Sequence, residues 1–281
     1  GIASDYDNWR QMGLNGWSSS DLLPYFKRSE GSLHRQDQYH GNHGPLKVEP
    51  ARNFGKLDKA FIKAALQSGH NFLEDFNGPV RTGVSSVDST VHKGIRQSSA
   101  LAYLHKIPKH LHIFMNTHIS RILFEQTKAV GIESTKGDKF FADQEVIICQ
   151  GAFGTPQLLM LSGIGPSDHL LSHGIKPIMD LQGVGQNLAD HIDVSIQYGS
   201  RSMDLSAAKY QRLDKAALLM GKWLLNGSGP GGGSLFSTVL FHALEDPNMP
   251  ELQVYMTPMI FDENFDNGES ESVPFFQRLG R

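Results

Sequence analysis

The residues best placed for chemistry lie where a predicted strand ends in a glycine turn and a predicted helix begins. Residues 146–149 form an apolar run that is typical of a strand buried on both faces. Gly151 and Gly154 end this strand, and Thr155 then caps a helix that has Pro156 at its first position. In open α/β sheets the free N–H groups of such a junction face a crevice and bind anionic groups. The turn is therefore a candidate site for a phosphate-bearing ligand.

Residues 151–165, read as Gly-Ala-Phe-Gly-Thr-Pro-Gln-Leu-Leu-Met-Leu-Ser-Gly-Ile-Gly, resemble the second signature of the glucose-methanol-choline (GMC) oxidoreductases. These are flavoenzymes that oxidise alcohols. The alternative is a strand and helix of another α/β protein without a flavin, because glycine turns of this kind are common. Further stretches also resemble the family: D-Y-D-x-W at 5–9, L-P-Y-F at 23–26, Y-H-G-x-x-G-P-L at 39–46, D-F-N-G at 75–78 and V-G-x-N-L-x-D-H at 184–191.

The resemblance implies FAD as the cofactor and supplies the candidate binding residues. The turn contributes Gly151, Ala152 and Thr155. Ile119 stands where the family usually has a Val that holds the flavin's adenine through its backbone, although a β-branched residue in a strand needs no ligand. Three further residues would lie near the cofactor: Asn187, Asp190 and His191.

Two places that contain histidine have a structural interpretation as well as a chemical one. Asp190 and His191 can be a general base held by its partner, or simply a pair in a loop. The family's catalytic histidine would lie beyond Arg281, so we assign no catalytic residue. The spacing of His40 and His43 is only a weak signal for metal ligands, and no cysteine lies nearby, so a turn-rich structural loop is favoured. We expect no metal site.

The pattern predicts a mixed α/β fold. The resemblance assigns residues 1–200 to the central part of an FAD-binding Rossmann-like domain and residues 201–281 to the start of an antiparallel-sheet substrate-binding domain. Apolar spacing predicts a helix from Leu57 to Gly69, and serines cap two others, one at 18–20 and one at 98–99. Strands are predicted at 46–48, 112–115, 119–124, 129–133 and 252–256. The glycine-rich residues 226–233 follow a helix and open none, so we interpret them as a flexible linker and not as a dinucleotide fingerprint.

Composition excludes several partner classes. The 281 residues include 29 acidic and 26 basic residues, so there is no electrostatic case for a nucleic-acid partner. No apolar run reaches the roughly 20 residues that a transmembrane helix needs.

Cys149 is the only cysteine, and its place in the predicted strand indicates a buried, packed thiol. A chain without disulfides favours an intracellular, cytoplasmic compartment. The acidic residues 262–271 are expected to be a solvated surface.

The sequence begins without a methionine and resembles the middle of a family member, so we expect an internal fragment of a longer protein. The expected substrate is a small alcohol, either choline-like or another aliphatic or aromatic primary alcohol; the oligomeric state is open. Two alternatives remain. Some family members bind FAD yet act as hydroxynitrile lyases, and a truncated product can persist as a module without catalysis. On its own the fragment is expected to be inactive and to hold FAD weakly.

Overall fold

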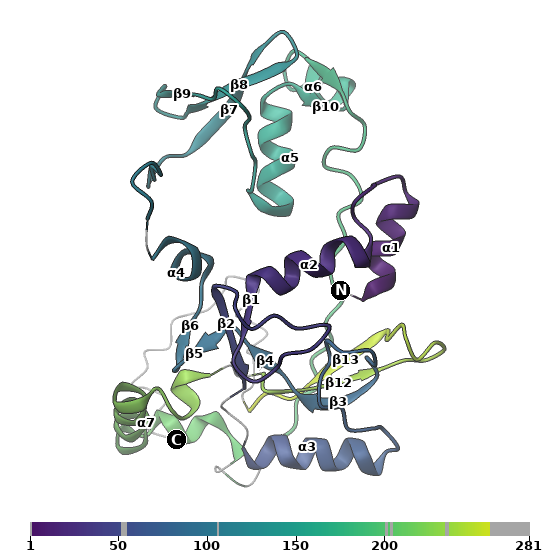
Figure 1. Ribbon diagram of the computed structural model, residues 1–281, viewed down its shortest axis with the longest axis vertical. Helices are drawn as coiled ribbons and strands as arrows, with labels where there is room; N and C mark the ends of the chain where they lie inside the picture. The colour runs from purple at the N-terminus through teal and green to yellow at the C-terminus, as the bar shows by residue number, and fades with distance from the viewer. Residues whose placement is uncertain are drawn as a thin grey trace. The chain divides into compact units, whose positions relative to one another are not determined.

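The chain divides into two compact units, shown in a computed structural model (Figure 1). Unit 1 consists of Gly1–Ile107 and Gln197–Arg281, and unit 2 consists of Pro108–Ile196. The structure describes residues 2–51, 55–105, 107–199, 202, 205–233 and 236–258. Helices and small sheets alternate in both units, so the predicted mixed α/β class is confirmed. Residues 262–271, predicted as a solvated surface, lie outside the described residues.

In its described residues, unit 1 contains helices of one to four turns and three small sheets. Its helices are α1 (Ala3–Gln11), α2 (Ser19–Ser29), α3 (Lys56–Gln67), α4 (Ser99–Leu104) and α7 (Leu213–Asn226), with 3₁₀ turns η2 (Ala207–Gln211) and η3 (Pro230–Gly232). Its strands are β1 (Glu30–Ser32), β2 (Leu46–Pro50), β3 (Gly83–Ser86), β4 (Asp88–Ser89), β5 (Val91–His92), β6 (Ile95–Arg96), β12 (Thr238–His242) and β13 (Leu252–Tyr255). The sheet orders are β1-β2-β4, β5-β6 and the antiparallel β13-β12-β3.

The core of unit 1 lies where α3 packs on the sheet β13-β12-β3. Ala65 on the helix is buried against Val84 and Leu240, which lie opposite each other on β3 and β12. Gly69, with φ +89°, follows the end of the helix, as its sequence predicts. Asp58 fixes the other end of the helix, because its carboxylate accepts the backbone N–H of Gly55 (2.8 Å) and the hydroxyls of Ser237 and Thr238 (both 2.6 Å).

Side-chain caps set the beginnings of two helices in unit 1, and both were predicted from serines. At α2, the Ser18 hydroxyl accepts the backbone N–H of Asp21 (3.2 Å), and the Asp21 carboxylate accepts the backbone N–H of Ser18 (3.1 Å). At α4, the Ser98 hydroxyl accepts the backbone N–H of Leu101 at 3.1 Å. Each cap satisfies a helix N–H that has no partner within the helix.

Within the glycine-rich residues 226–233, two glycines are packed closely against the chain, which differs from the predicted flexible linker. Gly227 is the left-handed C-cap of α7 (φ +65°) and is buried, as is Gly232 in η3. A Cβ on Gly227 would stand 1.9 Å from the Lys93 carbonyl oxygen, and one on Gly94 would stand 2.3 Å from the Gly227 oxygen. Trp223 locks the contact by donating its indole N–H to the Gly94 carbonyl (2.9 Å). Glycine serves here for close approach of two backbones.

Unit 2 combines an antiparallel meander with a helix. Its elements are β7 (Ile119–Glu125), β8 (Lys128–Ser134), β9 (Lys139–Phe141), α5 (Gly151–Leu161), β10 (Ile164–Gly165), α6 (Ser167–Ser172) and β11 (Met179–Asp180). The sheet order is β7-β8-β9, and β10 pairs with β11 in parallel. The hairpin of β7 and β8 was predicted from its β-branched residues. The register shifts between Ile119 and Arg121, which marks a bulge beside Ile119.

A buried serine fixes α5 against β7. The Ser162 hydroxyl donates to the Leu158 carbonyl of the helix (2.6 Å) and accepts the Ile122 backbone N–H of the strand (2.9 Å). Ser162 is 6% exposed, so both bonds are shielded from water. This one side chain therefore connects the end of the helix to the middle of the strand.

Three predictions in unit 2 are wrong. Residues 146–149 form no strand and Cys149 is exposed, because a buried strand needs hydrogen-bonded neighbours and no described strand pairs with this segment. Residues 112–115 likewise form no strand. Helix α5 begins four residues before Thr155, at Gly151, with Gln150 as its N-cap, so Thr155 and Pro156 lie inside the helix.

The assignment of residues 1–200 and 201–281 to cofactor and substrate domains stays a prediction. The sheet β13-β12-β3 pairs residues from both sides of that boundary. Among the helices of the described residues, none has the length and apolarity that crossing a membrane requires.

Candidate functional site

The first turn of α5 is the centre of the candidate site. Helices leave their first four N–H groups without an intrahelical partner and carry a partial positive charge at that end. The first turn of α5 contains no acidic side chain, and the Gln150 side chain makes no cap hydrogen bond. Gly151 has φ +76°, and the position of a Cβ on it would be in open space, with no atom within 4 Å. An anionic group can therefore approach this turn without displacing a side chain.

A hollow of about 470 Å³ lies between α5 and the start of β7. Ile119, one of the predicted cofactor residues, lines it together with Gly154 of the helix. The remaining lining residues are largely polar: His118, Ser120, Thr135, Gln150, Gln157, and with them Leu158 and Leu161. Backbone and polar side chains thus lie next to Ile119, a setting that suits a ligand held through hydrogen bonds.

A second hollow, of about 490 Å³, lies between α5 and residues 184–189. Ala152, Thr155 and Asn187 line it, so three predicted residues meet there. Asn187 has the left-handed φ of +57° and Gly185 one of +78°. Such a backbone is costly for a residue other than glycine and is concentrated at functional sites. Four of the predicted residues therefore lie around two hollows that share Gln157 of α5: Ile119, Ala152, Thr155 and Asn187.

Asp190 and His191 line neither of these two hollows. Both are exposed and belong to the irregular segment that follows residue 187. The Asp190 carboxylate accepts the backbone N–H of His191 at 2.8 Å. Because this bond goes to the backbone, it does not orient the imidazole as a general base would require. The interpretation as a loop pair agrees with this contact, and the place of both residues near the cofactor stays a prediction.

Sequence reasoning missed several residues that line the first hollow. Gln157 lies three positions after Gly154, and the helical period alone places both on one face of α5. Thr135 follows β8 and is brought next to the start of β7 by strand pairing, where its backbone N–H donates to the His118 carbonyl (2.9 Å). No local pattern in the sequence marks Thr135. Ser162, which holds α5 in place, lies in the stretch 151–165, but no local pattern indicates its contact with Ile122, which is distant in the sequence.

Comparison with known proteins shows which family the chain resembles. The sequence profile of the GMC oxidoreductases matches residues 1–193. An oxygen-dependent choline dehydrogenase from Brucella ovis is 37% identical over 264 residues, which is 92% of this chain and 48% of that protein. The mitochondrial choline dehydrogenase of Homo sapiens is 38% identical over 266 residues, which is 92% of this chain and 44% of that protein.

Among solved structures, a formate oxidase from Aspergillus oryzae RIB40, studied for its FAD modification, aligns with a TM-score of 0.69. It is 27% identical and covers 86% of this chain and 44% of that chain. The chain spans about half the length of the curated relatives it matches. Because the family profile covers more than half of its residues, the chain belongs to the GMC oxidoreductase family.

Proposed function

We propose that this chain is part of an FAD-dependent oxidoreductase that acts on the CH–OH group of a primary alcohol. The observation that carries the proposal is the first turn of α5, which offers free N–H groups and a glycine in open space, with no acidic side chain to compete for them. The family of the chain and its similarity to proteins described as choline dehydrogenases support the same class of reaction.

The residues of unit 2 suit the binding of such a cofactor. The backbone of Ile119 would hold the adenine in the first hollow, and the N–H groups of Gly151 and Ala152 would face a negatively charged part of the molecule. Thr155 and Asn187 would line the second hollow around it. When bound, FAD supplies an acceptor for the hydride of the alcohol carbon. The part of this chain is to bind and orient the cofactor, and we assign no base among the described residues.

The proposed substrate is a small primary alcohol, and choline is the first to test because two relatives are described as choline dehydrogenases. The experiment uses protein made from the complete reading frame that contains these residues. The protein is saturated with FAD, and the loss of flavin absorbance is followed without oxygen after adding choline, benzyl alcohol or ethanol. Bleaching by an alcohol at a rate consistent with turnover is expected. Cleavage of a cyanohydrin without bleaching indicates a lyase. If the protein shows neither activity, the alternative of a binding module without catalysis is favoured.

The site itself is tested by a matched pair of substitutions. Gly151→Asp places a carboxylate at the first turn of α5, where it would repel an anionic group, so FAD affinity should fall at least about tenfold. Gly174→Asp is the control, because Gly174 has a similar φ of +71° and the same open space after α6. FAD titration of both variants in the complete protein measures the difference. Equal affinity of the two variants would contradict the assignment of this turn.

A further inference from the structure

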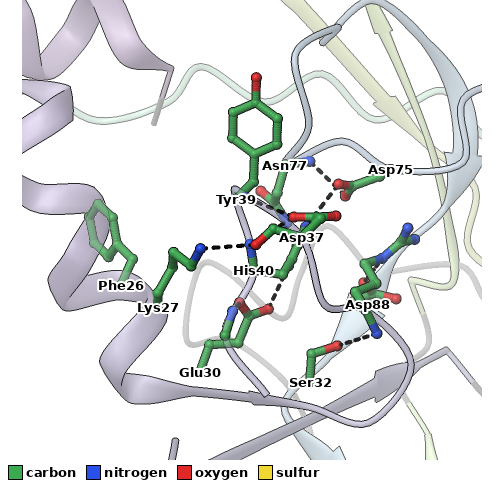
Figure 2. Close-up of polar contacts among 12 residues, drawn as sticks. Phe26, Lys27, Glu30, Ser32, Asp37, Tyr39, His40, Asp75, Asn77 and Asp88 are labelled. Carbon is green, nitrogen blue, oxygen red and sulfur yellow. Dashed lines mark hydrogen bonds and ion pairs between the residues drawn. The ribbon is translucent and has the colours of Figure 1, made fainter. Parts of the chain in front are cut away.

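A buried histidine lies between two carboxylates in unit 1 (Figure 2). The His40 side chain is 2% exposed. Its Nδ1 lies 2.9 Å from Oε1 of Glu30, and its Nε2 lies 2.9 Å from Oδ2 of Asp75. Glu30 begins β1, directly after α2, whereas Asp75 belongs to the loop between α3 and β3. The imidazole therefore connects its own loop to the neighbouring β1 and to Asp75, which is 35 positions away.

Both contacts require a donor on the histidine. A carboxylate only accepts, and a neutral imidazole has a single N–H, whereas an imidazolium has two. With His40 protonated, both carboxylates receive a hydrogen bond. With His40 neutral, one bond is lost and a ring lone pair faces a carboxylate oxygen. Burial disfavours the imidazolium, but the hydrogen bonds and charges of Glu30 and Asp75 outweigh it, so the pKa of His40 is raised above its ordinary value.

The loop that contains His40, residues 33–45, is held closely by the same partners. The second oxygen of Glu30 accepts the backbone N–H of Gly41 (2.9 Å), and the Glu30 carbonyl accepts that of Gly44 (2.8 Å). A Cβ on Gly41 would stand 1.9 Å from the Lys27 carbonyl oxygen, so the loop backbone lies directly on the end of α2. The geometry of Glu30 thus controls both the imidazole and the loop backbone.

The other charged groups around this loop come from each neighbouring element. Lys27 of α2 donates to the Asp37 and Gln38 carbonyls (2.9 and 3.0 Å). The Asp37 carboxylate accepts the backbone N–H groups of Tyr39 and His40. Although burial acts against its charged form, these bonds hold the pKa of Asp37 below its ordinary value.

Two further side chains of the same loop contact a carboxylate. His34 and Arg35 both contact the carboxylate of Asp88, each at 3.1 Å. Arg35 also donates to the Glu74 carbonyl. His34 has one carboxylate partner, which Arg35 already neutralises, and 26% of its side chain is exposed. His40 is therefore the group whose loss of a proton leaves a buried contact unsatisfied.

We propose that His40 is a pH-sensitive fastener that holds the 33–45 loop to β1 and to the Asp75 loop, and that it releases this loop as the pH rises. The device is separate from the proposed oxidoreductase activity and lies entirely in unit 1. In the released loop the imidazole is hydrated and has its ordinary pKa near 6.5. Since the fastened state binds the proton more tightly, its stabilisation is complete below that pH. It is lost as the pH rises to the higher pKa of the fastened state.

Hydrogen exchange of the unaltered chain tests the proposal without any substitution. The reporters are the amides of Gly41 and Gly44, whose N–H groups donate to Glu30. After correction for the intrinsic exchange rate, their protection should be constant below about pH 6.5 and should then fall by up to about tenfold per pH unit, because one proton is released on opening. Protection that stays constant from pH 6 to pH 9 would overturn the proposal.

Three variants identify the group responsible. His40→Gln, which bears no titratable ring, should abolish the pH dependence. Asp75→Asn removes one of the two charges and should move the transition toward pH 6.5. His34→Gln, on the same loop, is the matched control and should keep the original transition. If His34→Gln removes the pH dependence, or if Asp75→Asn leaves the transition where it was, His40 is not the fastener. NMR titration of the imidazole protons gives the same answer where a variant folds poorly.

Discussion

Two glycines near the end of α7 share a left-handed backbone and differ in their surroundings. Gly227 has φ +65° and Gly229 has φ +82°. A Cβ on Gly227 would overlap the Lys93 carbonyl, whereas one on Gly229 would have only Leu219 Cδ1 near it, at 4.0 Å. The sequence does not distinguish them, because both belong to the same glycine-rich run. Lys93, whose carbonyl makes the difference, lies more than a hundred positions earlier.

The first prediction compares these two glycines. Gly229→Ala should reduce the free energy of unfolding by about 1 to 2 kcal/mol, which is the cost of a left-handed residue with a side chain. Gly227→Ala should add the cost of overpacking and lose about 3 kcal/mol or more. Urea denaturation of unit 1, followed by tryptophan fluorescence, measures both. Equal losses would show that the contact with the Lys93–Gly94 turn is loose.

The second prediction concerns Ser162. Ser162→Ala removes the acceptor of the buried Ile122 N–H, so the free energy of unfolding should fall by about 1 to 3 kcal/mol. Ser172→Ala is the control, because the Ser172 hydroxyl donates to the His169 carbonyl on an exposed surface. The control should stay within about 0.5 kcal/mol of the unaltered chain. A Ser162→Ala variant as stable as the control would mean that water replaces the serine.

At the scale of elements, the sequence was informative wherever local patterns decide the structure. Helix α3 was predicted from the spacing of its apolar residues, and the serine caps of α2 and α4 from their position before helical stretches. The β7–β8 hairpin followed from β-branched runs that a turn separates. In each case the partners are neighbours in the sequence, at most fifteen positions apart in the hairpin (Ile119 and Ser134), so local patterns contain the signal.

The missed elements depend on partners that local patterns cannot reveal. Residues 146–149 have the composition of a buried strand, yet Ile147 is 73% exposed and no strand pairs with it in the part of the chain that the structure describes. The two sides of the candidate site could not be predicted for the same reason, because the segments that form them are distant in the sequence. Periodicity places Gly154 and Gln157 on one face of α5, but only the fold brings Ile119 to that face and Asn187 to the other side.

The third prediction is made for helix α2. Ser18→Ala removes the side-chain acceptor of its N-terminal cap and should cost about 1 kcal/mol. Ser19→Ala is the control, because Ser19 contacts Asp7 through its backbone N–H. Circular dichroism during urea denaturation measures the free energy of unfolding of the two variants. If Ser19→Ala loses as much stability as Ser18→Ala, Ser18 is not the cap of α2.

The same cap has a pH signature. Hydrogen bonds from the Ser18 side chain and backbone hold the pKa of Asp21 below its ordinary value. Their stabilisation is therefore present above that ordinary value and is lost as the pH falls through the lowered pKa. In Ser18→Ala the pKa of Asp21 should move up toward the ordinary value, as carboxyl NMR titration can measure. An unchanged pKa would mean that the backbone N–H alone sets it.

At the scale of the whole molecule, the chain spans about half the length of the relatives that it matches. The fourth prediction is that the 281-residue chain alone binds FAD weakly, because the irregular segment before α5 lacks strand neighbours among the described residues. Equilibrium dialysis against FAD measures this, with the complete protein as the control. Tight, stoichiometric binding by the isolated chain would refute the prediction.

The order of the strands has a consequence for how the protein folds during synthesis. Unit 2 is continuous in sequence, and all of its strands have left the ribosome's active centre once residue 180 is made. Strand β3 of unit 1 must wait for its partner β12, which begins at Thr238, so until then Val84 lacks its contact with Leu240 and has only the α3 side of the core. Unit 2 is thus able to fold while the older unit 1 is still open. The later half of the chain should therefore limit the rate at which the earlier half becomes resistant to proteases.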